Sequence, residues 1–194
     1  MKKLIGAKKI KTAVFISGKG TNLKNLIKFS LKKNSPILIN LIICNNKNAK
    51  GLKYASQFNI EKKIISFKNK KISENKILNL LFKKKVTFIC LAGFMEVLSN
   101  NFINKFKGKI INIHPSLLPK YKGLNTHKRI LENKEKISGC TVHYVTAKLD
   151  SGKIIMSKTV KIKQNDTPKT LQKKILKKEY LLYPQAIKKI FINL

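Results

Sequence analysis

Hydrophobic and polar positions follow two periods along this chain, and the two periods alternate. Short, nearly continuous apolar runs rich in β-branched and aromatic residues are typical of strands buried on both faces. Between these runs, leucine and isoleucine recur every three or four residues, which predicts amphipathic helices. In the first part of the chain we therefore predict strands over 12–17, 36–44, 63–67, 86–92 and 109–113 and helices over 22–33, 50–58 and 72–84.

This alternation predicts a Rossmann-like α/β fold, with a mixed, mainly parallel sheet and helices on both of its faces. The last third of the chain differs. Two predicted strands, 139–146 and 154–162, are separated only by a short loop, which favours an antiparallel pair. A terminal helix is predicted over 168–192, with a break or kink at Pro184.

With 194 residues and a hydrophobic content of 43%, the chain can bury a substantial core as one domain. It has neither an internal repeat nor a flexible linker, so we expect a single domain over 1–194 with a basic N-terminal extension, 1–11. No apolar window approaches the roughly 20 residues of a membrane span. Lysines interrupt the apolar start too early for a signal peptide. We therefore expect a cytoplasmic protein that does not contact membranes.

Three cysteines, Cys44, Cys90 and Cys140, are widely spaced within apolar runs. Disulfide frameworks and zinc sites need cysteines at closer, recognisable spacings. The pattern therefore favours buried thiols, and we expect no metal ion.

The net charge of +35 at pH 7 admits two interpretations. One is nucleic-acid binding, because phosphates attract lysine and arginine. However, Arg129 is the single arginine among 43 basic residues, and the lysines are spread along the chain rather than clustered. Abundant lysine, isoleucine and asparagine indicate codon drift in an A+T-rich genome, so we expect no dedicated nucleic-acid partner. The charge still favours the capture of anionic small molecules.

The most specific chemistry lies where the predicted strand 109–113 ends. Asn112 and His114 are two residues apart, so their side chains point to the same side of the strand, and the chain breaks at Pro115. Open α/β sheets bind ligands beyond the carboxyl ends of their strands. A buried carboxylate such as Asp150, one of only two aspartates, would raise the pKa of the imidazole and orient it. An amide and an imidazole in this arrangement can stabilise an oxyanion and move a proton without a covalent nucleophile.

Simpler interpretations stay open for several residues. Asp150 is followed closely by a glycine and can serve only as a turn residue. Ser116 has no histidine–carboxylate pair of its own, so we do not expect it to be a nucleophile. His127, near a predicted helix start, and His143, within a predicted strand, are expected to be structural or to support the site indirectly.

A turn over Ser17–Asn22 joins the first predicted strand to the first predicted helix and contains two glycines. Glycines let backbone N–H groups approach a phosphate, and a helix N-terminus adds a favourable partial charge. Alternatively, the turn is merely tight, with Thr21 or Asn22 capping the helix. Because the motif is neither a full G-x-G-x-x-G nor a Walker A sequence, it leaves both interpretations open.

Taken together, these stretches resemble the glycinamide ribonucleotide formyltransferases, the folate-dependent enzymes of purine biosynthesis. The resemblance runs from Thr12 nearly to the end of the chain, and its motifs occur in the right order. The stretches concerned are 16–22, 91–95, 111–121, 139–145 and 149–152. The resemblance implies the formyltransferase fold and a one-carbon transferase that uses 10-formyltetrahydrofolate as co-substrate. The formyl group would pass to the amine of 5-phosphoribosylglycinamide.

The resemblance also implies roles for individual residues. The catalytic residues would be Asn112, His114 and Asp150. The phosphate and ribose of phosphoribosylglycinamide would be bound by Gly20, Thr21, Asn22 and Glu179. The folate-binding residues would be Lys70, Met95, Glu96, Val97, Leu98 and Asn112.

Two of these positions depart from the family's usual residues. Glu96 stands where arginine is common, which reverses the charge of the side chain beside the pterin pocket. If this position acts through its backbone, the change is tolerable. Lys70 replaces an arginine expected near the folate tail, and it keeps the charge without the bidentate fork. The departures leave the three catalytic residues unchanged.

Other functions fit parts of the pattern. Methionyl-tRNA formyltransferase shares the Asn, His and Asp chemistry but normally has an additional C-terminal RNA-binding domain, for which we expect no residues here. Formyltetrahydrofolate deformylase normally has an N-terminal regulatory domain and a different loop after the histidine. A lysine-rich RNA-binding module is the non-enzymatic alternative. We expect small-molecule substrates and either a monomer or a homodimer.

Overall fold

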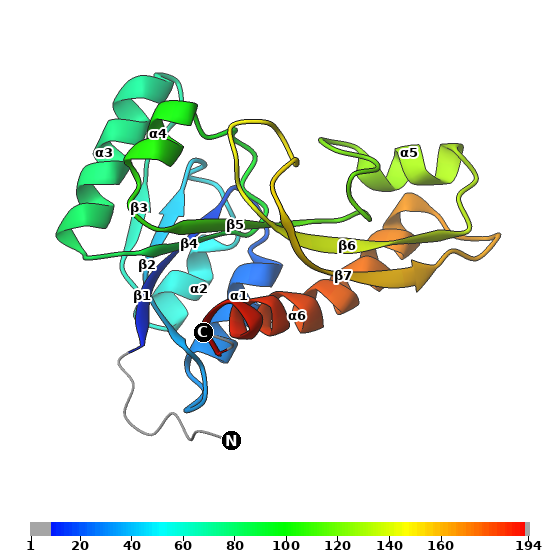
Figure 1. Ribbon diagram of the computed structural model, residues 1–194, viewed down its shortest axis with the longest axis horizontal. Helices are drawn as coiled ribbons and strands as arrows, with labels where there is room; N and C mark the ends of the chain where they lie inside the picture. The colour runs from blue at the N-terminus through cyan, green and yellow to red at the C-terminus, as the bar shows by residue number, and fades with distance from the viewer. Residues whose placement is uncertain (1–8, 193–194) are drawn as a thin grey trace. The chain divides into compact units, whose positions relative to one another are not determined.

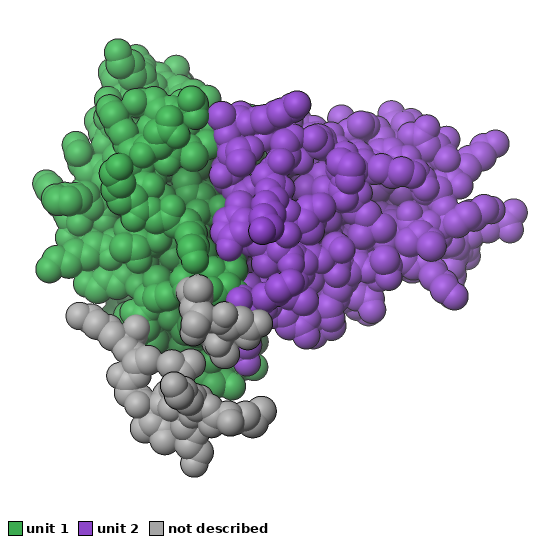
Figure 2. Space-filling view, in the orientation of Figure 1, with its two compact units in different colours: residues 1–110, 190–194 green, residues 111–189 purple. Residues whose placement is uncertain are grey.

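The computed structural model of the chain describes residues 9–192 (Figure 1). They divide into two compact units, drawn in different colours in Figure 2. Unit 1 extends to Ile110 and includes the chain from Ile190 onward, whereas unit 2 comprises Ile111–Lys189. Of the predicted extension 1–11, residues 1–8 lie outside the described residues, and the last two belong to the first strand. The single domain over 1–194 stays a prediction.

Unit 1 contains four parallel strands and four helices. The strands are β1 (Ile10–Ile16), β2 (Ile37–Cys44), β3 (Lys62–Ile64) and β4 (Phe88–Leu91), with β1 paired to β2 and β4, and β2 paired to β3. The helices are α1 (Thr21–Ser30), α2 (Leu52–Gln57), α3 (Lys70–Lys83) and α4 (Asn100–Lys105). In Figure 1, α1 and α2 lie on one side of these strands and α3 and α4 on the other.

The core of unit 1 explains this layering. The last five residues of β1 are all buried, as expected for a strand covered on both faces. The ring of Phe15 meets those of Phe94 and Phe102 edge-on, with centroids 5.4 and 6.4 Å apart. Burying an apolar side chain of this kind stabilises a fold by about 1.5–3 kcal/mol, so these contacts fix the strand against its helices.

Unit 2 is built around antiparallel pairing. Its strands are β5 (Lys109–His114), which begins in unit 1, β6 (Ile137–Tyr144) and β7 (Ile154–Lys161). Its helices are α5 (Thr126–Glu132) and most of α6 (Pro168–Ile192). The β6–β7 ladder is antiparallel, which confirms the pair predicted for the last third, and β5 and β6 are antiparallel as well. The sheet order is β3-β2-β1-β4-β5-β6-β7, which confirms the predicted mixed α/β fold.

Two predictions about helices require correction. The six-residue helix α4 was not predicted, because Phe102 is its one buried side chain and a single buried position shows no helical period. The side chain of Ser99 marks its start by accepting a hydrogen bond from the N–H of Phe102. No break occurs at Pro184, since α6 continues through it. The residues on both sides of the proline, Tyr183 and Ala186, are fully buried, and a kink at Pro184 stays a prediction.

All three cysteines are buried, which confirms the predicted buried thiols. Within residues 9–192, every helix is either too short or too polar to cross a membrane. The same residues contain no group of three histidine, cysteine or acidic side chains placed to hold a metal ion.

Candidate active site

Asn112 and His114 lie near the end of β5, and the strand register fixes their neighbours. Across the β5–β6 ladder, Asn112 is paired with His143 and His114 with Thr141. His114, His143 and Thr141 are all buried. Because alternate residues of a strand face the same side, the side chains of Asn112 and His114 project together.

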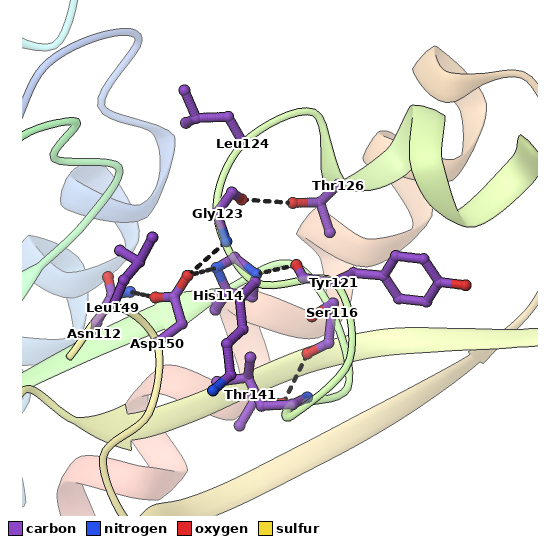
Figure 3. Close-up of polar contacts among 12 residues, drawn as sticks. Asn112, His114, Ser116, Tyr121, Gly123, Leu124, Thr126, Thr141, Leu149 and Asp150 are labelled. Atoms are coloured by element: carbon purple, nitrogen blue, oxygen red, sulfur yellow. Dashed lines mark hydrogen bonds and ion pairs between the residues drawn. The ribbon is translucent and has the colours of Figure 1, made fainter. Parts of the chain in front are cut away.

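Asp150, in the turn between β6 and β7, contacts both of these side chains (Figure 3). Its Oδ2 atom lies 3.3 Å from Nδ1 of His114, and its Oδ1 atom lies 3.5 Å from Nδ2 of Asn112. Nε2 of His143 lies 3.6 Å from Oδ1 of Asp150 and 3.3 Å from Nδ2 of Asn112. The structure thus brings the three predicted catalytic side chains into one cluster, and their catalytic roles stay a prediction.

The backbone around Asp150 aims its carboxylate at this cluster. Its φ angle of 45° lies in the left-handed region, which aspartate tolerates better than most residues. The N–H group of Gly123 donates a hydrogen bond of 2.9 Å to Oδ2 of Asp150. Burial raises the pKa of Asp150, but contacts with His143, Gly123 and His114 outweigh burial and lower the pKa to about 2. Asp150 is therefore ionised at neutral pH.

The imidazole of His114 faces an acceptor at each nitrogen. Nδ1 faces Asp150, and Nε2 lies 2.8 Å from the carbonyl oxygen of Tyr121. Burial nevertheless lowers the pKa of His114 below its ordinary value, although the Tyr121 carbonyl and the Asp150 charge raise it in part. The expected effect of Asp150, which raises the pKa of this imidazole, is present, but desolvation of the buried ring exceeds it, so the net shift is downward.

The other two histidines flank this cluster. Nδ1 of His143 lies 2.8 Å from the carbonyl oxygen of Tyr144, which leaves Nε2 to face Asp150 and Asn112. His127 lies in the first turn of α5, and burial followed by the charge of His114 lowers its pKa. Both positions agree with the predicted supporting role.

The segment after β5 supplies contacts that sequence analysis did not identify. Thr141 on β6 donates a hydrogen bond of 2.7 Å to the carbonyl oxygen of Ser116 and accepts one of 3.1 Å from the N–H of Leu118. The hydroxyl of Ser116 donates to the carbonyl oxygen of Lys120, 2.6 Å away, which agrees with a structural rather than a nucleophilic serine. These bonds fix the beginning of the segment that ends in α5.

Two backbone groups of this segment, the Tyr121 carbonyl and the Gly123 N–H, complete the contacts of His114 and Asp150. Main-chain groups have no residue-type motif, so the sequence did not reveal them. The only signal was the pair of prolines, Pro115 and Pro119, which indicated a fixed loop.

In unit 1, the Ser17–Asn22 turn ends in a helix start that no side chain caps. The N-cap residue is Gly20, with a φ angle of 69°, so the alternative in which Thr21 or Asn22 caps α1 is wrong. A Cβ atom on Gly20 would lie 2.6 Å from Cα of Gly51, which makes glycine necessary there. An uncapped helix N-terminus with a glycine turn is suited to bind a phosphate.

The predicted folate-binding segment Met95–Leu98 is held at both ends. The N–H of Met95 donates a hydrogen bond of 2.8 Å to Oγ of Ser17. Directly after the segment, the N–H and hydroxyl of Ser99 both donate to the buried carboxylate of Glu74 on α3. Sequence analysis did not single out Glu74, although it is one of only eight acidic residues. These contacts connect the segment to the Ser17 turn and to α3.

The remaining predicted binding residues have separate surroundings. Oε1 of Glu96 accepts a hydrogen bond of 2.7 Å from Nδ2 of Asn45, which follows β2. Lys70 is exposed at the start of α3. In unit 2, Glu179 on α6 is buried, and it adds to burial in raising the pKa of Cys140 to about 12. Their ligand contacts stay predictions.

Comparisons with known proteins agree with the motifs. The protein-family model described as formyl transferase matches residues 10–187. A phosphoribosylglycinamide formyltransferase from Haemophilus influenzae is 39% identical over 92% of this chain and 85% of its own length. The trifunctional purine biosynthetic protein adenosine-3 of Gallus gallus is 40% identical over 94% of this chain. The chain spans only 18% of that relative's length.

Solved structures give the same result. The phosphoribosylglycinamide formyltransferase of Anaplasma phagocytophilum superposes with a TM-score of 0.90 at 38% identity, covering 96% of this chain and 88% of that chain. The phosphoribosylglycinamide formyltransferase of Brucella melitensis has a TM-score of 0.89 at 39% identity, covering 94% of this chain and 96% of that chain.

Proposed function

The chain belongs to the formyl transferase family, and on that premise we propose that it transfers a formyl group from 10-formyltetrahydrofolate to the amine of 5-phosphoribosylglycinamide. This reaction is a step of de novo purine (IMP) biosynthesis, and we propose the cytoplasm as its location. The main support from the structure is the convergence of Asn112, His114 and Asp150 in unit 2.

Attack by the substrate amine builds negative charge on the formyl oxygen. We infer that the amide of Asn112 donates a hydrogen bond to this oxygen, and one preorganised donor of this kind can contribute about 3 kcal/mol to the barrier reduction. The same charge raises the pKa of the nearby His114 imidazole. Protonation of His114 is therefore favoured more in the transition state than before it, which is the condition for catalysis.

The amine must also lose a proton, and the departing folate nitrogen must gain one. Asp150, with a pKa of about 2, is a poor proton acceptor at neutral pH and acts by orienting the His114 ring and stabilising its charge. His114 accepts the proton of the amine, directly or through a water, and passes it to the leaving nitrogen. Before the substrate binds, the Tyr121 carbonyl holds Nε2 of His114 in the orientation in which the substrate then takes the place of this carbonyl.

Residues of unit 1 provide most of the proposed binding contacts. The uncapped start of α1, with Gly20, Thr21 and Asn22, binds the substrate phosphate through backbone N–H groups. Glu179, in unit 2, binds the ribose. Folate contacts are proposed for Lys70, Met95, Glu96, Val97, Leu98 and Asn112. Among them, Met95 and Val97 are apolar residues that are 62% and 47% exposed, so they can contact a ligand.

The direct test combines the purified protein with 10-formyltetrahydrofolate and either phosphoribosylglycinamide or charged initiator tRNA. Release of tetrahydrofolate that depends on phosphoribosylglycinamide supports the proposal. Turnover only with the tRNA would overturn the proposed substrate and indicate a methionyl-tRNA formyltransferase. Salt-sensitive RNA binding without any folate-dependent turnover would overturn the proposed activity and favour an RNA-binding module.

A further inference from the structure

Arg129, on α5, contacts the segment next to the proposed catalytic cluster without touching the cluster itself. Its Nη1 atom donates a hydrogen bond of 2.6 Å to the carbonyl oxygen of Lys122 and lies 3.5 Å from that of Leu124. Its guanidinium carbon lies 5.6 Å from the centroid of the Tyr121 ring. One guanidinium thus contacts three of the four residues 121–124, which we call the clamp segment.

The clamp segment presents two main-chain groups to the cluster. The Tyr121 carbonyl faces Nε2 of His114, and the Gly123 N–H donates to Oδ2 of Asp150 (Figure 3). Tyr121 and Gly123 have φ angles of 57° and 78°, in the left-handed region that a tyrosine rarely adopts without outside support. Arg129 contacts the carbonyl oxygens of Lys122, between these two residues, and of Leu124, directly after them. These contacts stabilise the backbone in this left-handed conformation.

We propose that Arg129 is a positioning residue that holds the clamp segment, so that Tyr121 and Gly123 orient His114 and Asp150. A guanidinium suits this task because its flat face stacks on an aromatic ring while its N–H groups donate to carbonyl oxygens. A lysine ammonium is a point charge on a flexible stem and does not combine these contacts. The catalytic consequence rests on the proposed function, whereas the structural part does not.

Two further observations support this assignment. Every other lysine or arginine position among the 43 is a lysine, so Arg129 is the one side chain of this sequence that can offer a planar guanidinium. Side chains of the clamp segment form hydrogen bonds elsewhere. The Tyr121 hydroxyl donates one of 2.8 Å to Oε1 of Glu135, and Nζ of Lys122 donates one of 2.6 Å to Oγ of Ser151. Outside the cluster, two side chains of α5 donate to the main chain of the clamp segment: Thr126 to the carbonyl oxygen of Gly123, 3.1 Å away, and Arg129 to those of Lys122 and Leu124.

The test is Arg129→Lys, which keeps the charge and removes the planar fork. We expect kcat to fall about tenfold, a modest share of what misplacement of reacting groups can cost, with the KM values for both substrates within about twofold. We also expect faster hydrogen exchange at the Gly123 amide. The charge at position 129 lowers the pKa of His114 and is kept by lysine, whereas the Tyr121 carbonyl that raises it is less well held, so this pKa, followed by NMR, should fall. The charged or titratable groups that act on this ring are Asp150, His143, His127 and Arg129.

Lys128→Gln is the matched control, since Lys128 is the preceding residue of α5, largely exposed, and pairs with Glu132 one turn away. This variant should leave kcat, Gly123 exchange and the pKa of His114 unchanged. The proposal is overturned if Arg129→Lys keeps kcat within twofold, or if kcat falls while Gly123 exchange and the pKa of His114 stay at the wild-type values.

Should Arg129→Lys fail to fold, Tyr121→Leu examines the same contact from the other side by removing the ring beneath the guanidinium. The same three changes are expected, and their absence overturns the proposal. If the wild-type protein transfers no formyl group to phosphoribosylglycinamide, the proposed function fails. Gly123 exchange and the pKa of His114 then still decide whether Arg129 fixes the clamp segment.

Discussion

The predicted binding region of unit 1 and the catalytic cluster of unit 2 are held together by different kinds of group. In unit 1, the Ser17 turn depends on a glycine at a close approach, and the Met95–Leu98 segment is held by backbone N–H groups that donate to the side chains of Ser17 and Glu74. In unit 2, the side chains of Asn112, His114 and Asp150 contact one another directly. The comparison teaches which positions tolerate substitution, because a backbone donor is present in nearly any residue and an imidazole in only one.

Glu96 illustrates the tolerant kind of position. The family resemblance led us to expect an arginine there, yet the carboxylate of Glu96 has a partner in Asn45. The neighbouring backbone is fixed through Met95 and Ser17, independently of the side chain at 96. This agrees with the interpretation in which position 96 acts through its main chain.

Asp150→Asn should give the largest effect, and it tests whether the cluster of unit 2 depends on particular side chains. The substitution keeps the shape but removes the charge that raises the pKa of His114 and fixes its ring, so we expect kcat to fall by about a thousandfold. Steady-state rates would measure this, with phosphoribosylglycinamide affinity by calorimetry as the control for binding. A kcat near that of the wild-type protein would remove Asp150 from the mechanism.

Gly20→Ala tests the opposite side of the comparison, where the main chain matters. The added Cβ atom would lie 2.6 Å from Cα of Gly51, at a φ angle that favours glycine. We expect a KM for phosphoribosylglycinamide raised about tenfold and a free energy of unfolding lower by about 1–3 kcal/mol. Gly18→Ala is the matched control, because a Cβ atom there meets nothing within 4 Å. Equal effects of the two variants would argue against a phosphate site at Gly20.

The pH dependence of stability should come from unit 2, which contains all three histidines. Burial lowers the pKa of His114 and His127, so the unfolded chain binds more protons than the folded one as the pH falls through about 6.5. The free energy of unfolding should therefore decrease between pH 7.5 and 5.5. Urea midpoints would measure it, and His127→Gln should flatten the slope. The low pKa of Asp150 adds stability that is lost only near pH 2 to 4.

Glu96→Gln should have the smallest effect. Glutamine keeps an oxygen that accepts the hydrogen bond from Asn45, and the backbone is unchanged. We expect the KM for 10-formyltetrahydrofolate to stay within about twofold. A change above tenfold would mean that the carboxylate itself contacts the folate, and position 96 would then belong with the side-chain-dependent group.

Interactions between residues close together in the sequence were predictable, whereas those between distant residues or through the main chain were harder to predict. The two-residue spacing of Asn112 and His114 placed both side chains together, since strand geometry is local. No spacing rule joins residues as far apart as His114 and Asp150, so the scarcity of aspartates only suggested their partnership and the family resemblance strengthened it. The sequence indicated that Asp150 raises the pKa of His114, but the net lowering was missed because burial, its largest cause, is a property of the folded chain. The contacts of Tyr121 and Gly123 were missed because they are main-chain contacts.

The burial of all three thiols has a practical consequence. Desolvation raises the pKa of Cys44, and it raises that of Cys140 to about 12, so alkylating reagents find almost no thiolate while the chain is folded. Labelling by such a reagent would therefore occur only when the interior opens. Because Cys44 and Cys140 belong to different units, mass spectrometry of the labelled peptides would report which half opens first, without an introduced probe.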